Sequence, residues 1–142
     1  MSQDTSISRG LIIQSPHIDR ILAGEKTWEL RSTNTKMRGP IALIKSGTGT
    51  VLGFANLNDS ISPVEREILL RAKEKHGLTS DFIQNAIDNG KWKWDHAWVM
   101  DDAVALQDPI PYTHKPGTVI WAKFPHEETQ RLSAAYRELK NI

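Results

Sequence analysis

The sequence predicts an α+β fold, a small and partly closed β-barrel of about five to six strands with flanking and inserted helices. Short segments rich in β-branched and aromatic residues, separated by turns with glycine or proline, indicate the strands. In the middle of the chain, residues 62–95 change to helical spacing of apolar residues, which predicts a helical insert. With 142 residues and no linker or repeat, the chain (1–142) is expected to form one domain.

The expected elements follow one another closely along the chain. In order, they are a flexible arm (1–9), a buried strand (11–13), a short helix (15–23), a strand (27–32), two hairpin strands (41–44 and 51–57), a helix (63–76), a short helix (79–87), strands at 97–100, 104–106 and 119–124, and a C-terminal helix (126–140). We expect the prolines between residues 109 and 117 to form a loop before the last strand.

Local residue preferences set the first helix and the strand after it. Ser15 can cap the helix, Pro16 suits its first position, and Gly24 ends it. In the strand, Trp28 and Leu30 share one face because side chains alternate. The polar residues of that strand therefore occupy the other face.

The hairpin is predicted from an apolar run at residues 41–44 and a glycine-containing loop at residues 46–49. Gly53 in the second strand indicates a bulge or a close backbone approach. Lys45 and Ser46, at the end of the apolar strand, could reach a pocket. The loop could offer amides to a phosphate, but it lacks the Gly-Lys-Ser/Thr of a P-loop, so a simple turn is favoured.

Composition excludes several classes of function. The net charge of +1 gives no case for a strongly polyanionic partner, so a nucleic-acid site would have to be local. The absence of cysteine excludes disulfides, thiolate nucleophiles and Cys-ligated zinc. We expect no signal peptide, no membrane span and a cytoplasmic location, because the first residues are polar and no apolar run approaches about 20 residues.

A dense polar cluster follows the first helix. It consists of Lys26, Thr27, Glu29 and Arg31. Arg31 could bind a phosphate or a base edge in forked geometry, and Glu29 could orient it or accept a hydrogen bond from a base amino group. Lys26 could contact phosphate or act as a base if burial lowers its pKa. The alternative is an exposed ion pair on a surface strand, worth about 0–1 kcal/mol.

A second candidate alternates basic and aromatic residues at the end of the insert. The segment 91–94 reads Lys-Trp-Lys-Trp, and aromatic platforms beside lysines suit stacking of single-stranded bases. The favoured alternative is that Trp92 and Trp94 pack beneath the inserted helices, because large aromatic residues usually serve cores.

Metal and triad chemistry are not expected. The five histidines are dispersed, and an HExxH-like start at His126 fails because Gln130 stands where the second histidine should be. No Gly-x-Ser-x-Gly motif is present. We therefore predict no metal and no cofactor.

The motifs resemble the ASCH domain (activating signal cointegrator homology). The resemblance covers roughly residues 11–124 and is carried by Pro16, Ile21-Leu22-x-Gly24-x-Lys26-Thr27-x-Glu29-x-Arg31 and Arg38-Gly39-x-Ile41-Ala42-Leu43-Ile44-x-Ser46. It implies a PUA-like β-barrel with a cleft that binds RNA or DNA. Some ASCH proteins are amidohydrolases acting on 4-acetylcytidine, and others cut single-stranded RNA.

The resemblance separates these activities at one position. The amidohydrolases have a lysine and an arginine that match Lys26 and Arg31, but their threonine nucleophile falls at Glu29 here. A glutamate at this place is typical of the cointegrator-type domains, which are viewed as nucleic-acid binders.

Three hypotheses follow for the function. The favoured one is binding of RNA, of another single-stranded nucleic acid or of a nucleoside in a cleft containing Lys26, Thr27, Glu29, Arg31, Arg38, Lys45 and Ser46. The alternative is a hydrolase in the same cleft, with Lys26 as the base and Glu29 positioning a water or the lysine, although the sequence shows no histidine partner near them. A protein-interaction module using residues 62–95 is the third, which an exposed Trp92/Trp94 patch would favour.

Overall fold

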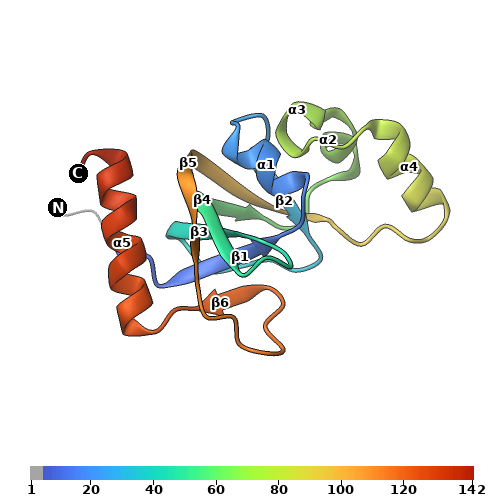
Figure 1. Cartoon of the computed structure of the whole chain (residues 1–142). Coiled ribbons are helices and arrows are strands. Elements are labelled where there is room, and N and C mark those ends of the chain that lie inside the picture. The colour runs from blue at the N-terminus through green and yellow to red at the C-terminus, as the bar shows by residue number, and fades with distance from the viewer. Residues whose placement is uncertain (1–4) are drawn as a thin grey trace.

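The computed structural model describes residues 5–142, in which one six-stranded curled sheet forms the centre (Figure 1). Its strands are β1 (Arg9–Ile13), β2 (Trp28–Arg31), β3 (Gly39–Lys45), β4 (Thr50–Ile61), β5 (His96–Pro111) and β6 (Trp121–Lys123). The helices are α1 (His17–Leu22), α2 (Arg66–Arg71), α3 (Lys73–His76), α4 (Ser80–Asp88) and α5 (His126–Lys140). The strand order is β2-β5-β4-β3-β1-β6, and β1 and β3 are parallel whereas the other pairs are antiparallel.

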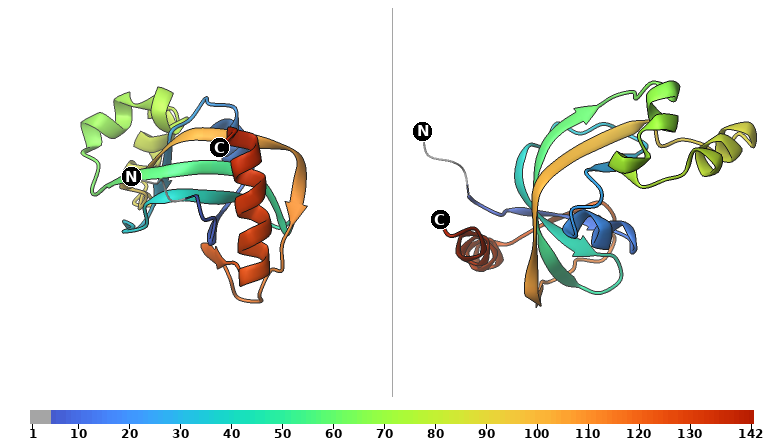
Figure 2. Two further views of the ribbon diagram at one scale, coloured as in Figure 1. Left: turned by 90° about the vertical axis from the view of Figure 1, so that its left-hand side faces the viewer. Right: turned by 90° about the horizontal axis from the view of Figure 1, so that it is seen from above.

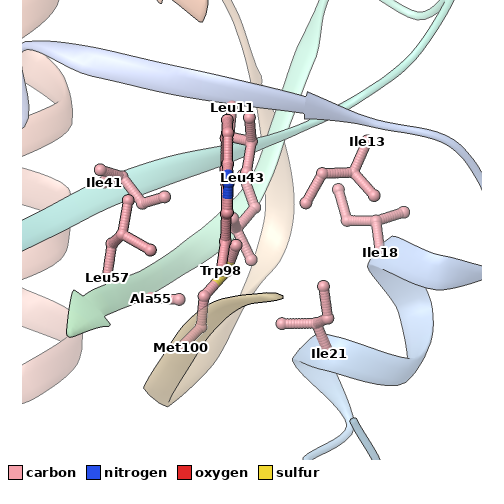
Figure 3. Close-up of a cluster of buried hydrophobic side chains, with 10 residues drawn as sticks. All are labelled: Leu11, Ile13, Ile18, Ile21, Ile41, Leu43, Ala55, Leu57, Trp98 and Met100. Atoms are coloured by element: carbon pink, nitrogen blue, oxygen red, sulfur yellow. The ribbon is translucent and has the colours of Figure 1, made fainter. Parts of the chain in front are cut away.

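The sheet is buried on both faces, which explains the unbroken apolar run of β3. Ile41 and Leu43 lie in the cluster inside the curl of the sheet that also contains Ile18 and Ile21 of α1 (Figure 3). Ala42 and Ile44 point to the other face, into a cluster that includes Leu132 of α5. Helix α1 therefore fills the inside of the half-barrel, and α5 lies against its outer face (Figure 2).

The insert, residues 62–95, forms a third hydrophobic cluster at one end of the sheet. Trp28 and Leu30 of β2 pack on one side against Leu69 of α2 and Ile83 of α4, as the strand alternation predicted. Thr79 caps α4 by accepting a hydrogen bond from the Phe82 amide at 3.1 Å, and this helix also agrees with the sequence. The insert is thus anchored to the strand that carries the polar cluster.

The structure differs from the sequence-based expectation in two local features near the N-terminus. Ser15 makes no capping bond to the α1 backbone; its hydroxyl donates to Asp19 Oδ2 at 2.5 Å instead. Part of the expected flexible arm is packed, because Ile7 is fully buried and its amide donates to Ser133 Oγ of α5 at 2.8 Å. The burial of Ile7 against α5 explains why this part of the arm is packed on the domain. Residues 1–4 of the arm lie outside the described residues.

The single helix expected over residues 63–76 is two helices, α2 and α3, that meet at Ala72. A side chain bridges the break: Nε2 of His76 donates to the carbonyl of Leu69 at 2.6 Å, and its Nδ1 accepts from the amide of Leu78 at 3.0 Å. His76 thereby satisfies a carbonyl at the end of α2, a group that a helix terminus leaves without an intrahelical partner. Gly77 ends α3 in the left-handed conformation, which favours glycine.

The strands expected at residues 97–100 and 104–106 are one continuous strand, β5. This strand also includes Pro109 and Pro111, which we expected to lie in a loop. β5 pairs with β4 through several register shifts, one of them beside Gly53, as expected for a bulge. Pro109 and Pro111 are tolerated because β2 pairs only with the first part of β5, as far as Val99. The second part is therefore a sheet edge, where an amide donor is not needed.

Candidate functional site

A pocket of about 380 Å³ opens at the end of the half-barrel between α1, β2, the insert and the segment before β6. Its polar floor consists of His17, Lys26, Glu29 and Arg31, and the exposed Gln14 and Ser46 also line the pocket. Its apolar rim consists of Leu78, Phe82, Trp94, Val119 and Ile120. The volume lies at the lower end of the range of small-molecule sites, which is roughly 300–1,000 Å³.

Glu29 joins two cations at the floor of the pocket. One carboxylate oxygen lies 3.1 Å from Nζ of Lys26 and the other lies 3.0 Å from Nη2 of Arg31. The side chains of Lys26 and Glu29 are only 3% and 9% exposed, so this is a buried network rather than the surface pair that the sequence left open. Because buried charges are costly unless they are paired, the three side chains hold one another in place.

Arg31 is fixed further by the sheet beneath it. Nη2 donates to the carbonyl of Ile12 at 2.9 Å, and the guanidinium lies 5.4 Å over the ring of Trp98. Its Nε is buried and has no hydrogen-bond partner among the described residues. Arg31 therefore lines the pocket with a fixed guanidinium, and its donor capacity for a ligand is on Nη1, because Nε is shielded and Nη2 bonds to Ile12 and Glu29.

Lys26 contacts a histidine that sequence reasoning did not place at the site. Nζ of Lys26 lies 3.1 Å from Nδ1 of His17, the first residue of α1. Burial lowers the pKa of Lys26, and Glu29 opposes that shift. Burial and the charge of Lys26 also lower the pKa of His17. The hydrolase hypothesis assumed no histidine near Lys26, and that assumption is wrong.

The backbone explains how Lys26 comes to point inward. Gly24 ends the α1 segment with a φ of 78°, a conformation that favours glycine, and turns the chain toward β2. Thr27 then anchors the chain: its amide donates to the Lys75 carbonyl at 2.9 Å and its carbonyl accepts from the Met100 amide at 2.8 Å. The side chain of Thr27 is exposed and does not line the pocket.

The other sequence-predicted site residues are divided between the pocket and the surface. Ser46 lines the pocket, whereas Lys45 next to it does not. Arg38 is exposed and lies outside the pocket, where it donates to the carbonyls of Thr35 and Met37 at 2.9 and 2.7 Å and lies 3.8 Å from Asp59. The structure thus brings Lys26, Glu29, Arg31 and Ser46 together and leaves Thr27, Arg38 and Lys45 outside.

The sequence indicated Trp94 of the apolar rim as a stacking candidate, but it did not indicate Phe82, Val119 and Ile120. Phe82, Val119 and Ile120 are 53%, 73% and 43% exposed although they are large hydrophobic residues. Phe82 comes from α4, and the other two precede β6, so the residues are far apart in the chain. Exposed hydrophobic side chains gathered around a polar floor are typical of a ligand site.

Within residues 5–142, no three histidine or carboxylate side chains are grouped as metal ligands would be. No helix in the same range is long and apolar enough to cross a bilayer. The chemistry that the pocket itself offers is hydrogen bonding, charge and apolar contact.

The curled sheet, with α1 inside it and α5 outside, defines a PUA-like α+β fold. Residues 11–109 match the ASCH domain model, and the chain belongs to the ASCH domain family. The fold is similar to the crystal structure of ASCH from Zymomonas mobilis, with a TM-score of 0.68 and 18% identity over 92% of this chain and 96% of that chain.

Two mutants of the Zymomonas mobilis ASCH protein are similar as well. A tyrosine-to-phenylalanine mutant gives a TM-score of 0.67 at 18% identity, over 89% of this chain and 96% of that chain. A serine-to-alanine mutant gives a TM-score of 0.64 at 17% identity, over 89% of this chain and 94% of that chain. The comparison with curated proteins gave no match.

Proposed function

We propose that the pocket binds one nucleotide of single-stranded RNA, or the corresponding free nucleoside, with the base between the apolar rim and the polar floor. Membership of the ASCH family supports an RNA-binding or hydrolase-type domain. The observation that carries the proposal is the combination of a buried Lys26–Glu29–Arg31 network with three exposed hydrophobic residues around it. A nucleobase needs both, because it has apolar faces and polar edges.

Two residues of the floor and one of the rim have side chains whose chemistry suits contact with a nucleotide. Arg31 donates to a base carbonyl or a phosphate oxygen through Nη1, because Glu29 pairs with Nη2 and Nε is buried. Glu29 has lone pairs beyond those used by Lys26 and Arg31, and these accept from an exocyclic amino group. Phe82 offers an aromatic face for stacking at the rim.

The experiment is titration of the purified protein with a labelled single-stranded RNA at several salt concentrations. Arg31→Gln is expected to lose at least tenfold in affinity, and Arg38→Gln serves as the matched control because Arg38 lies outside the pocket. Thermal melting of both variants separates loss of binding from loss of fold. Equal affinity of Arg31→Gln and the wild type would contradict the proposal.

A hydrolase in the same pocket is a second candidate, favoured by the contact between Lys26 and His17. A lysine whose pKa is lowered by burial can serve as a base, and an imidazole within hydrogen-bond distance can take or return its proton. The substrates to assay are 4-acetylcytidine and single-stranded RNA. Product that disappears in Lys26→Ala and falls in His17→Phe would establish the enzyme, and an unchanged rate in Lys26→Ala would exclude this mechanism.

A further inference from the structure

The segment from Lys91 to Asp95 joins α4 to β5 beside the pocket without helix or strand structure. The two lysines of the segment, Lys91 and Lys93, are exposed, whereas Trp92 and Trp94 are partly buried against the insert. They form no fully exposed aromatic patch, which removes the feature that would favour a protein-interaction module. Trp94 also lines the pocket, so the basic and aromatic segment is continuous with the candidate site.

The two tryptophans differ in what holds them. The indole nitrogen of Trp92 donates to Asp95 Oδ1 at 2.7 Å, and its backbone amide donates to the carbonyl of Ala86 at 3.1 Å. Trp94 packs edge to face on Trp92, with ring centroids 5.3 Å apart and an interplanar angle of 78°. Trp92 is therefore an anchored support, and Trp94 is the ring that it orients toward the pocket.

Lys93 lies over the ring that faces the pocket. Its Nζ is 5.6 Å from the centroid of the Trp94 ring, within the range of a cation–π contact. Because Lys93 is exposed, its side chain can leave the ring face for a phosphate without giving up buried surface. An aromatic face with a mobile ammonium group beside it matches a base and its phosphate.

We propose that Trp94 and Lys93 form a second nucleotide subsite, in which Trp94 stacks on the base next to the one held in the pocket and Lys93 contacts the intervening phosphate. This inference rests on the proposed function, and it selects a strand of RNA over a free nucleoside as the ligand. The position of Trp94 on the pocket wall is what joins the two subsites. A ligand of two or more nucleotides therefore gains contacts that a mononucleotide cannot make.

The test compares a 5′-mononucleotide with a tetranucleotide RNA of the same base by calorimetry. The wild type is expected to bind the tetranucleotide at least about tenfold more tightly. Trp94→Leu is expected to weaken the tetranucleotide more than the mononucleotide and so remove most of that advantage, whereas Trp94→Phe keeps most of it because an aromatic face remains. Lys93→Gln, an exposed change that spares the fold, is expected to weaken only the tetranucleotide, by about threefold.

Lys140→Gln is the matched charge control, since Lys140 ends α5 at the opposite end of the molecule from α4 (Figure 1). Equal wild-type affinity for the two ligands overturns the second subsite and leaves the pocket proposal standing. Equal weakening of both ligands in Trp94→Leu also overturns it, because Trp94 would then serve the pocket alone. Failure of the wild type to bind either ligand overturns the proposed function together with this inference.

Discussion

Nζ of Lys26 lies 3.1 Å from Nδ1 of His17 at the floor of the pocket. An ammonium group can donate hydrogen bonds but cannot accept them. A charged Lys26 therefore donates to Nδ1 of a neutral imidazole that carries its proton on Nε2. Burial is the largest cause of the lowered pKa of each residue, and for His17 the charge of Lys26 comes next. The protonation state of His17 therefore depends on the charge of Lys26.

Two substitutions should move the pKa of His17 in opposite directions. Lys26→Met removes a positive neighbour and is expected to raise the pKa of His17 toward its usual value of 6.5. Glu29→Gln removes a negative neighbour and is expected to lower it further. Titration of the histidine ring resonances by NMR measures both shifts, with the exposed His126 as an internal reference. A shift in the same direction in both variants would contradict this account of the site.

Removing Glu29 should destabilise the fold, because it leaves two cations together in a buried place. We expect Glu29→Ala to lower the free energy of unfolding by about 3–5 kcal/mol, the usual cost of breaking a buried ion pair from one side. Urea denaturation measures the change. Glu67→Ala is the control, because its pair with Arg71 is about 80% exposed and contributes at most about 1 kcal/mol.

The compensating variant sharpens this prediction. Lys26→Met combined with Glu29→Leu removes both members of one buried pair and is expected to be less destabilised than Glu29→Ala, because only Arg31 is left without its partner. If the double variant loses as much stability as Glu29→Ala or more, the compensation argued here is wrong.

The parts of the fold that the sequence predicted well are those fixed by local patterns. The continuous apolar run at residues 41–44 indicated a strand, and Gly53 indicated a bulge or a close backbone approach, because each depends on residues that are neighbours in the chain. Lys26, Glu29 and Arg31 were predicted together for the same reason, since they lie within six residues of one another.

The features that the sequence did not predict depend on contacts between elements that are distant in the chain. His17 lies near Lys26 only because Gly24 reverses the chain between them, and no spacing rule contains that turn. Phe82 and Val119 meet at the rim only after the insert has packed on β2. The division of residues 63–76 into two helices likewise requires the His76 side chain to reach the carbonyl of Leu69.

Gly53 should not tolerate a side chain. A Cβ atom at this position would collide with the carbonyl oxygen of Val104 in β5 and with the side chain of Leu22, at a place where the sheet cannot easily move. Gly53→Ala is expected to lower the free energy of unfolding by about 1–3 kcal/mol, measured by thermal melting. Gly90→Ala is the comparison, because Gly90 has open space around it and only a φ of 68°, which costs about 1 kcal/mol.

The buried His76 should make the stability of the protein depend on pH in the acid range. Burial, the main cause, lowers the pKa of His76 below its usual value of 6.5, and the charge of Lys26 adds to the shift. At pH values between the lowered pKa and 6.5, His76 is protonated in the unfolded chain but neutral in the folded protein. The free energy of unfolding therefore falls as the pH drops through this window. The loss amounts to about 1.4 kcal/mol for each unit of the shift.

His76→Gln is expected to flatten that dependence, because glutamine does not titrate there. It can still donate to the carbonyl of Leu69 from the same region of the insert, so part of the helix break is preserved. Urea denaturation at a series of pH values from 7.5 down to 5 gives the slope. His126→Gln, a change at an exposed position in α5, is the control for the loss of a histidine, and a slope in His76→Gln equal to that of the wild type would contradict the role of His76.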